Sequence, residues 1–218
     1  MKKGFTWLIV IVLVVSSLLL AACGTSTTKS EGSYLTINFE QVSTWVRNFN
    51  PFSASALGST ATAIYEPMMI YNKATGKLVP WLATDYKWSD DNLSLTFTIR
   101  PNVKWSDVEP FTAKDVVYTY QLMKQNDALT GTANSVLGEY IDSFSAPDDS
   151  TVVFKFKTVY TPALYDIANQ VIVPEHIWKD VSDPLTWTND NPVATGPFTQ
   201  VTKFESQIYV LEKNPYYW

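Results

Sequence analysis

The sequence predicts a fold that mixes α-helices with antiparallel β-strands. Residues 93–100 alternate apolar and polar side chains, which is typical of a strand with one buried face. Residues 111–125 repeat apolar side chains at steps of three and four, which is typical of a helix with one buried face. Residues 140–157 contain two strand patterns around the turn sequence Pro-Asp-Asp-Ser. Strands paired with their sequence neighbours, with helices among them, indicate the α/β class.

The N-terminal residues predict a secretory signal. A lysine pair after the first methionine precedes an apolar run over residues 5–22, as in a cleavable signal peptide. The run approaches the length of a membrane-spanning helix, so a permanent N-terminal anchor is the alternative. Residues 20–23 read Leu-Ala-Ala-Cys, which resembles the lipobox of bacterial lipoproteins. We therefore expect residues 1–22 to be removed and Cys23 to carry the lipid.

Cys23 is the only cysteine of the chain, so it has no disulfide partner within it. A single acyl chain holds a protein weakly, and a lipoprotein anchor therefore depends on several chains on one residue. Residues 24–33 contain no apolar side chain. Such a segment cannot offset its ordering entropy by burial, so we expect residues 23–33 to form a flexible tether on the extracytoplasmic face of the cell membrane.

The first part of the folded region is expected to contain two short strands. Residues 34–40 alternate and are rich in β-forming side chains, which predicts a strand. Residues 41–59 contain several Asn, Pro and Ser residues, which favour a loop over regular secondary structure. Residues 60–72 suggest a helical turn and then a short strand, which ends at the turn sequence of residues 72–77.

The strand over 93–100 and the helix over 111–125 are the clearest elements. The strand places four apolar side chains on one face: Leu93, Leu95, Phe97 and Ile99. Thr112 suits the N-cap of the helix, and Asp115 places a carboxylate near the positive helix end. The side chains expected on the buried helix face are Ala113, Val116, Val117, Tyr120 and Met123.

Five further elements are expected towards the C-terminus. Residues 161–168 predict a short helix opened by proline. Residues 170–178 predict a brief buried strand followed by another helical turn that starts at Pro174. Residues 191–204 and 207–214 predict two closing strands.

The composition argues against a nucleic-acid-binding protein. The net charge is −5 and no basic block is present, so nucleic acid is not an expected partner. Aromatic residues make up 14% of the chain. Aromatic side chains fill cores, and they also line sites for sugars and peptides.

The sequence gives no indication of catalysis. His176 is the single histidine, and no serine lies in a G-x-S-x-G motif. Acid pairs stand at 90–91, 107–109 and 148–149, in turn-like segments that explain them better than the paired carboxylates of a glycosidase. The sequence has no cluster of metal ligands and no phosphate-binding glycine loop. We therefore expect neither enzyme activity nor a metal or other cofactor.

Residues 65–121 contain a series of motifs in a fixed order. They include YEPMMIYN, PWLA, FTIRPNVKWSD and FTAKDV, and the motifs NPVATGPF and LEKNPYYW follow later. Together they resemble family 5 of the extracytoplasmic solute-binding proteins of ABC importers, the oligopeptide- and dipeptide-binding type, over residues 34–218. Two positions depart from the family pattern, because Val108 and Ala194 stand where the family usually has glycine. Glycine would suit a positive φ at position 108, so the hairpin tip is expected to differ in shape.

The resemblance implies a type II periplasmic-binding-protein-like fold, with two lobes that close on ligand about a hinge. Residues 34–65 would begin the first lobe, 66–190 would form an inserted α/β domain, and 191–218 would return to the first lobe. Family members are two to three times longer, so we expect the opposing lobe to be missing and the chain to be a fragment.

The resemblance also places the loop after the first strand at the ligand cleft. Trp45, Asn48 and Asn50 are the candidate ligand-binding residues, because Trp can stack on a sugar or a peptide side chain and Asn both donates and accepts hydrogen bonds. The alternative is structural: the aromatic and proline residues of this loop pack it onto the lobe, and the asparagines cap turns.

Oligopeptide is the ligand that the family resemblance implies first, with delivery to a membrane permease. A branch of the family binds short β-linked oligosaccharides, and NFNPF, PWLA and VPEHIW are similar to that branch. Peptides and oligosaccharides both bind to aromatic walls and amide hydrogen-bonding partners, so the residues leave the choice between the two ligand classes open. A surface lipoprotein with an adhesive or assembly role, without transport, is the third alternative.

Overall fold

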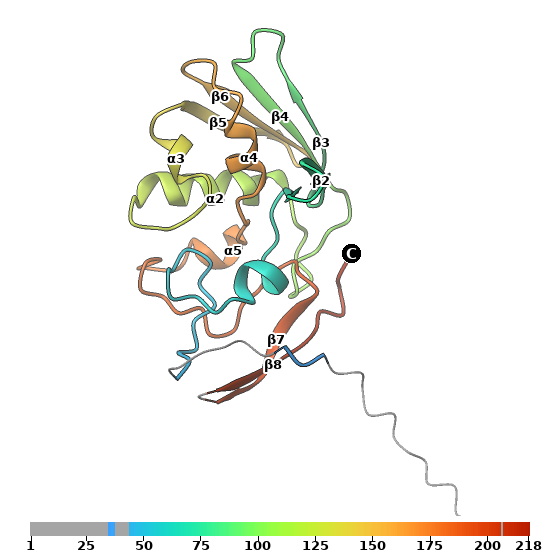
Figure 1. Cartoon of the computed structure of the whole chain (residues 1–218), viewed down its shortest axis with the longest axis vertical. Helices are drawn as coiled ribbons and strands as arrows, with labels where there is room; N and C mark the ends of the chain where they lie inside the picture. The colour runs from blue at the N-terminus through green and yellow to red at the C-terminus, as the bar shows by residue number, and fades with distance from the viewer. Residues whose placement is uncertain (1–34, 38–43, 206) are drawn as a thin grey trace, which may run out of the picture. The chain divides into compact units, whose positions relative to one another are not determined.

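The computed structural model describes residues 35–37, 44–205 and 207–218. Residues 43–218 form one compact unit, whose elements are shown in Figure 1. The signal, the tether and Cys23 lie outside the described residues. Of the strand predicted over 34–40, only residues 35–37 are described, and they are not part of a strand.

The unit begins with a loop, a single turn of π-helix and a hairpin. The turn η1 covers Thr60–Ile64. Strand β1 (Met69–Asn72) pairs antiparallel with β2 (Lys77–Pro80). Between them Asn72 accepts hydrogen bonds from two backbone N–H groups through its side chain, and Gly76 has a φ of +67°. The predicted loop, helical turn, strand and turn are confirmed.

The largest sheet in the described residues has four antiparallel strands. Its strands are β3 (Ala83–Trp88), β4 (Ser94–Ile99), β5 (Ile141–Asp148) and β6 (Thr151–Phe156), in the order β3-β4-β6-β5. The predicted strand over 93–100 and the predicted pair over 140–157 are confirmed. Three of the four apolar residues expected on one face of β4 are buried, but Leu93 is 37% exposed because it precedes the strand, at the end of the β3–β4 turn.

Helix α2 (Ala113–Gln125) covers the β5 and β6 side of this sheet (Figure 1). Its predicted cap is confirmed: the Thr112 hydroxyl accepts a hydrogen bond from the N–H of Lys114, and the Asp115 carboxylate accepts one from the N–H of Thr112 at 2.9 Å. This reciprocal arrangement satisfies N–H groups that the helix itself leaves free. The ring of Tyr120 packs edge-on against that of Phe154, with the centroids 4.8 Å apart.

The buried face of α2 is slightly rotated from the predicted one. Ala113, Val116, Tyr120 and Met123 are buried as expected, but Val117 is only half-buried. Thr119 is buried instead. Its hydroxyl accepts a hydrogen bond from the N–H of Val173, so a segment distant in sequence shifts the buried arc of the helix.

Three short helices lie around this layer. They are α3 (Asn134–Leu137), α4 (Ala163–Ala168) and α5 (Glu175–Trp178). The predicted helices after the prolines at 162 and 174 are confirmed. The strand predicted within residues 170–173 was wrong, because this segment makes only an isolated bridge between Val171 and Pro67. The N–H of Val173 is used by the Thr119 hydroxyl, and Pro174 has no N–H, so a ladder cannot continue.

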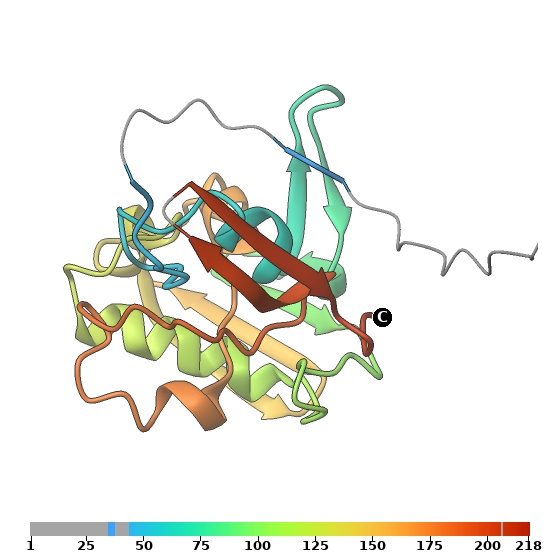
Figure 2. The same cartoon turned by 90° about the horizontal axis from the view of Figure 1, so that it is seen from below.

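The chain closes with a two-stranded antiparallel ribbon of β7 (Phe198–Glu205) and β8 (Ile208–Lys213), seen from below in Figure 2. The two closing strands are thereby confirmed. The N–H of Gly196 donates to the carbonyl of Ile64 at 2.9 Å, which joins the start of the ribbon to η1. The predicted boundaries at 65/66 and 190/191 remain predictions.

Val108, in the turn before α2, has a φ of +81°. A β-branched side chain is strained in this left-handed region, which glycine enters freely. The backbone conformation that glycine would suit is therefore present, although the residue is valine.

We expect Val108→Gly to stabilise the protein by about 1 kcal/mol, since relief of backbone strain exceeds the added entropy of the unfolded chain. Chemical denaturation measures this change. Val159→Gly is the control, because Val159 is also exposed but does not have a positive φ, and it should be destabilising. A loss of stability in Val108→Gly would contradict the strain at this position.

Candidate functional site

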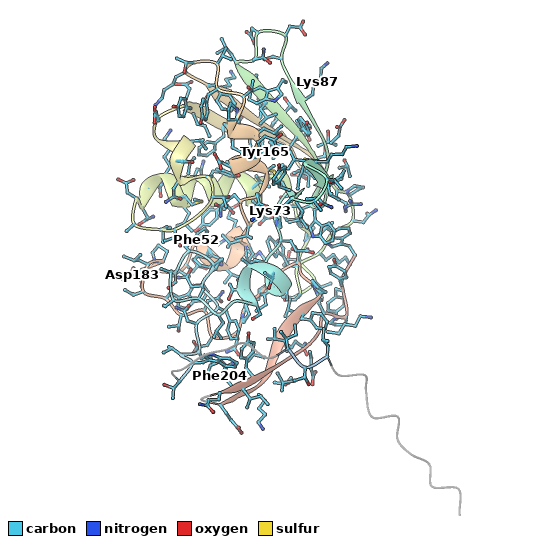
Figure 3. The ribbon with its side chains drawn as sticks, viewed as in Figure 1. Phe52, Lys73, Lys87, Tyr165, Asp183 and Phe204 are labelled. Atoms are coloured by element: carbon cyan, nitrogen blue, oxygen red, sulfur yellow. The ribbon has the colours of Figure 1, made fainter. Side chains whose placement is uncertain are left out.

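The loop of residues 44–50 lies against the β7–β8 ribbon. The half-buried ring of Trp45 meets the ring of Tyr209 edge-on, with the centroids 5.1 Å apart. Phe204, labelled in Figure 3, is stacked nearly parallel to Tyr209 at 6.0 Å. These three side chains, Trp45, Phe204 and Tyr209, form what we call the aromatic wall. Such a surface can contact a sugar ring or an apolar peptide side chain.

Arg47 lies on the aromatic wall. Its Nε–H donates to the backbone carbonyl of Asp190 at 3.0 Å, and one Nη donates to the side-chain oxygen of Asn191 at 2.8 Å. The guanidinium carbon lies 5.9 Å from the centre of the Phe204 ring. Three contacts therefore fix the orientation of this cation.

Asn48 is buried and shapes the loop. Its amide nitrogen donates to the hydroxyls of Ser53 and Ser55 at 3.1 and 3.0 Å. Its amide oxygen accepts the N–H of Asn50 at 3.0 Å. Both amide atoms thus have partners within the chain, as expected if this residue caps a turn.

Asn50 is fully buried and ties the loop to a distant segment. Its amide nitrogen donates to the carbonyls of Pro184 and Trp187 at 2.8 and 2.7 Å, and its oxygen accepts the N–H of Phe52 at 2.9 Å. Trp45, Asn48 and Asn50 lie in one loop, but Asn48 and Asn50 are buried and only Trp45 is half-exposed. Ligand contact by the three residues stays a prediction.

The sequence reasoning did not find Arg47, Phe204 and Tyr209 as neighbours of Trp45. The strand pattern over 207–214 indicated a face for Tyr209, but no local signal shows that this face meets the loop. Arg47 follows Trp45 by two positions, and this spacing in an extended segment was the one available clue.

A second aromatic cluster surrounds the buried Glu66, which is 4% exposed. Its carboxylate accepts hydrogen bonds from the indole of Trp81 at 2.7 Å, the indole of Trp218 at 3.1 Å and the phenol of Tyr217 at 3.2 Å. Arg100 covers Trp218, with its guanidinium carbon 4.3 Å from a ring centre. Burial, followed by the charge of Glu66, raises the pKa of Tyr217 to about 12.

The acid pairs behave as turn residues. Asp91 accepts the Ser89 hydroxyl and the N–H of Leu93, and the Ser89 bond is the first cause of its lowered pKa. Asp148 accepts the N–H and hydroxyl of Ser150.

His176 pairs with Asp107 at 2.8 Å on the surface. Within the described ranges, no three His, Cys, Asp or Glu side chains are grouped to hold a metal ion.

The hollows on the surface of the unit include the following two. The larger, about 390 Å³, is lined by residues between Ile177 and Trp187, including Asp183 (Figure 3). The smaller, about 270 Å³, lies over α2 beside Tyr118. Neither is lined by residues of the aromatic wall.

In the part of the chain that the structure describes, no helix is long and apolar enough to cross a membrane.

A family model described as "Bacterial extracellular solute-binding proteins, family 5 Middle" matches residues 77–218. The chain belongs to this family. Family 5 proteins are transport binding proteins rather than enzymes, and they act outside the cytoplasm. The family resemblance of the motif series is thereby confirmed.

Curated relatives match much of the chain. A Brucella ovis protein whose name is that of an ABC transporter peptide-binding protein is 32% identical over 175 residues. The match covers 78% of this chain and 32% of that protein. Protein XP55 of Streptomyces lividans is 39% identical over 135 residues, which are 61% of this chain and 24% of that protein. The chain thus spans about a third of the length of the first of these relatives.

Solved structures show the same fold. A periplasmic oligopeptide-binding protein of an ABC transporter from Thermotoga maritima, crystallised with mannohexaose, has a TM-score of 0.72 and 30% identity, over 80% of this chain and 32% of that one. NikA of Brucella suis, with Fe(III)-EDTA, has a TM-score of 0.69 at 24% identity, over 85% of this chain and 37% of that one, and shows the fold alone. The predicted fold class is confirmed: the described unit is part of a type II periplasmic-binding-protein fold.

Proposed function

We propose that this chain belongs to an extracytoplasmic binding protein that captures oligopeptides and delivers them to the membrane permease of an ABC importer. The observation that carries this proposal is the family 5 match over residues 77–218. The names of the Brucella ovis and Thermotoga maritima relatives, both peptide-binding, support the ligand class.

A short oligosaccharide is the second candidate ligand. The Thermotoga maritima protein is called oligopeptide-binding, yet its crystal structure holds mannohexaose. An aromatic wall would suit the apolar face of a pyranose ring as well as a peptide side chain. The mannohexaose in that relative favours a sugar ligand over an adhesive or assembly role without transport.

We place the ligand at the loop of residues 44–50. Trp45 would contact the ligand directly, because its ring is half-exposed on the aromatic wall. Asn48 and Asn50 would contribute indirectly, because their hydrogen bonds fix the shape of the loop that carries Trp45.

The test is calorimetry on the complete protein with both lobes, titrated with mixed tripeptides and with manno-, cello- and xylo-oligosaccharides. If the ligand is a sugar, we expect Trp45→Ala to weaken binding by about 1–3 kcal/mol, the scale of removing a large apolar contact. If peptides bind mainly through their backbone, the loss should be smaller.

Trp88→Ala is the matched control. Trp88 is also half-buried, but its ring packs on that of Phe156 in the four-stranded sheet, with the centroids 5.1 Å apart, so Trp88→Ala should leave affinity unchanged. If the complete protein with both lobes responded to neither ligand class, the transport proposal would be refuted and a non-transport surface lipoprotein favoured.

The membrane anchor is proposed at Cys23, within the Leu-Ala-Ala-Cys sequence. We expect Cys23→Ser to abolish lipid attachment and to leave the precursor unprocessed. Metabolic labelling with a fatty-acid analogue measures this, and Ser26→Ala should label as the unmodified protein does. Equal labelling of Cys23→Ser would exclude this cysteine as the acylation site.

A further inference from the structure

The aromatic wall packs on the ring of Phe49, which is fully buried. This ring meets those of Phe204 and Tyr209 edge-on, with the centroids 6.4 and 5.9 Å apart. Aromatic pairs keep a preferred geometry, so the position of Phe49 influences where the two rings of the ribbon lie. Phe49 thus links the loop of residues 44–50 to the ribbon.

The backbone of Phe49 is held by one distant segment. Its N–H donates to the carbonyl of Thr188 at 2.8 Å. Its carbonyl accepts a hydrogen bond from the side-chain amide of Asn189 at 3.1 Å, across 140 positions of the chain. Both polar backbone groups of Phe49 therefore have partners in residues 188–189.

Asn189 has an uncommon backbone conformation for a buried residue. Its φ is +51°, and it is 1% exposed. Few residues other than glycine enter this left-handed region, and asparagine is among those that do so most readily. Glycine would satisfy the backbone equally well, so the side chain is what distinguishes asparagine at this position.

The amide of Asn189 also reaches the π-helical turn η1. It donates to the hydroxyl of Tyr65, the residue after η1, at 2.7 Å. Ser59, the residue before η1, accepts a hydrogen bond from the hydroxyl of Tyr209 at 3.0 Å. The loop and the ribbon are therefore tied to opposite ends of the same turn, and π-helical turns are frequent at functional sites.

We propose that Asn189 is a positioning residue of the candidate ligand site: its amide fixes Phe49 and thereby sets the geometry in which Trp45 and Tyr209 meet the ligand. Asn189 does not contact the ligand, because it is buried. This inference rests on the proposed function, because it concerns the same site.

The experiment is a double-mutant cycle on the complete protein with both lobes, measured by calorimetry with Ala-Phe-Ala and with mannohexaose. The variants are Trp45→Ala, Asn189→Gly and the two combined. Glycine permits the left-handed backbone and removes only the side chain. We expect Asn189→Gly to weaken binding by about fivefold, the scale of a lost hydrogen bond. In the combined variant the two losses should not multiply, because Asn189 acts through the wall to which Trp45 belongs.

Two variants are the matched controls. Asn92→Gly makes the same substitution at a φ of +57°, in the turn between β3 and β4. Gln170→Ala removes another buried amide, whose oxygen accepts the N–H of Ala133 at 3.3 Å. Both should lower stability and leave affinity unchanged, which separates positioning from a general loss of stability. Should Asn189→Gly fail to fold, Asn189→Asp replaces it in the cycle, because it keeps the size of the side chain but has no N–H to donate.

The outcomes distinguish this inference from the proposed function. Binding of neither probe by the unmodified protein would overturn both. Binding that Trp45→Ala does not change would overturn the inference and the placement of the ligand, while the binding function stands. If Trp45→Ala weakens binding but Asn189→Gly does not, or if the two losses multiply in the combined variant, the inference alone is overturned.

Discussion

Replacing Gly196 by alanine is expected to destabilise the protein by about 3 kcal/mol or more. A Cβ atom at this position would lie 2.8 Å from the carbonyl carbon of Ile64 and closer still to the carbonyl oxygens of Ala63 and Ile64. These atoms belong to the backbone and cannot turn away as a side chain could. The same Gly196 donates its N–H to Ile64, so the clash would also break the bond that joins the ribbon to η1.

Urea denaturation measures this loss. Gly138→Ala is the matched control, because a Cβ there would meet nothing within 4 Å, and its stability should change by no more than about 0.5 kcal/mol. If Gly196→Ala were as stable as Gly138→Ala, the close approach of the two segments would not exist in solution.

Replacing Glu66 by alanine should cost about 2–4 kcal/mol of stability. The carboxylate is the shared acceptor of two indoles and a phenol, and its removal leaves Trp81, Tyr217 and Trp218 with unpaired donors in a largely buried place. The carboxylate joins the segment before β1, the turn before β3 and the residues after β8. Its loss should therefore loosen all three, not one local turn.

Glu66→Gln separates the hydrogen bonds from the volume of the side chain. Glu66→Gln keeps one acceptor oxygen and nearly the same side-chain size. The free energy of unfolding should therefore fall by about half as much as in Glu66→Ala. Glu212→Ala removes an exposed carboxylate and should have little effect. Thermal unfolding followed by tryptophan fluorescence compares the three variants, and equal stability of Glu66→Ala and Glu212→Ala would contradict the role of the cluster.

The sequence by itself determined the elements whose pattern repeats. The alternation over 93–100 predicted β4 because one side of a strand must be buried, and the three- and four-residue steps after Thr112 predicted α2 for the same reason. Thr112 and Asp115 predicted the start of α2, since a cap involves only neighbours within one turn. The ordered motifs indicated the family, which the match over residues 77–218 confirms.

Tertiary structure decided the parts that depend on distant partners. The segment 170–173 looked like a strand, but the Thr119 hydroxyl takes the N–H of Val173, and a bridge is all that forms. Local pattern records which face of a segment is buried, not which group will meet it there.

The candidate site followed the same division. Trp45, Asn48 and Asn50 could be named from the loop sequence, but Asn50 donates to carbonyls more than 130 positions away. Arg47 likewise acquires its orientation from Asp190 and Asn191, at separations of 143 and 144 residues. Residue type supplied the chemistry of the loop, and only the fold decided which of its polar groups are used internally.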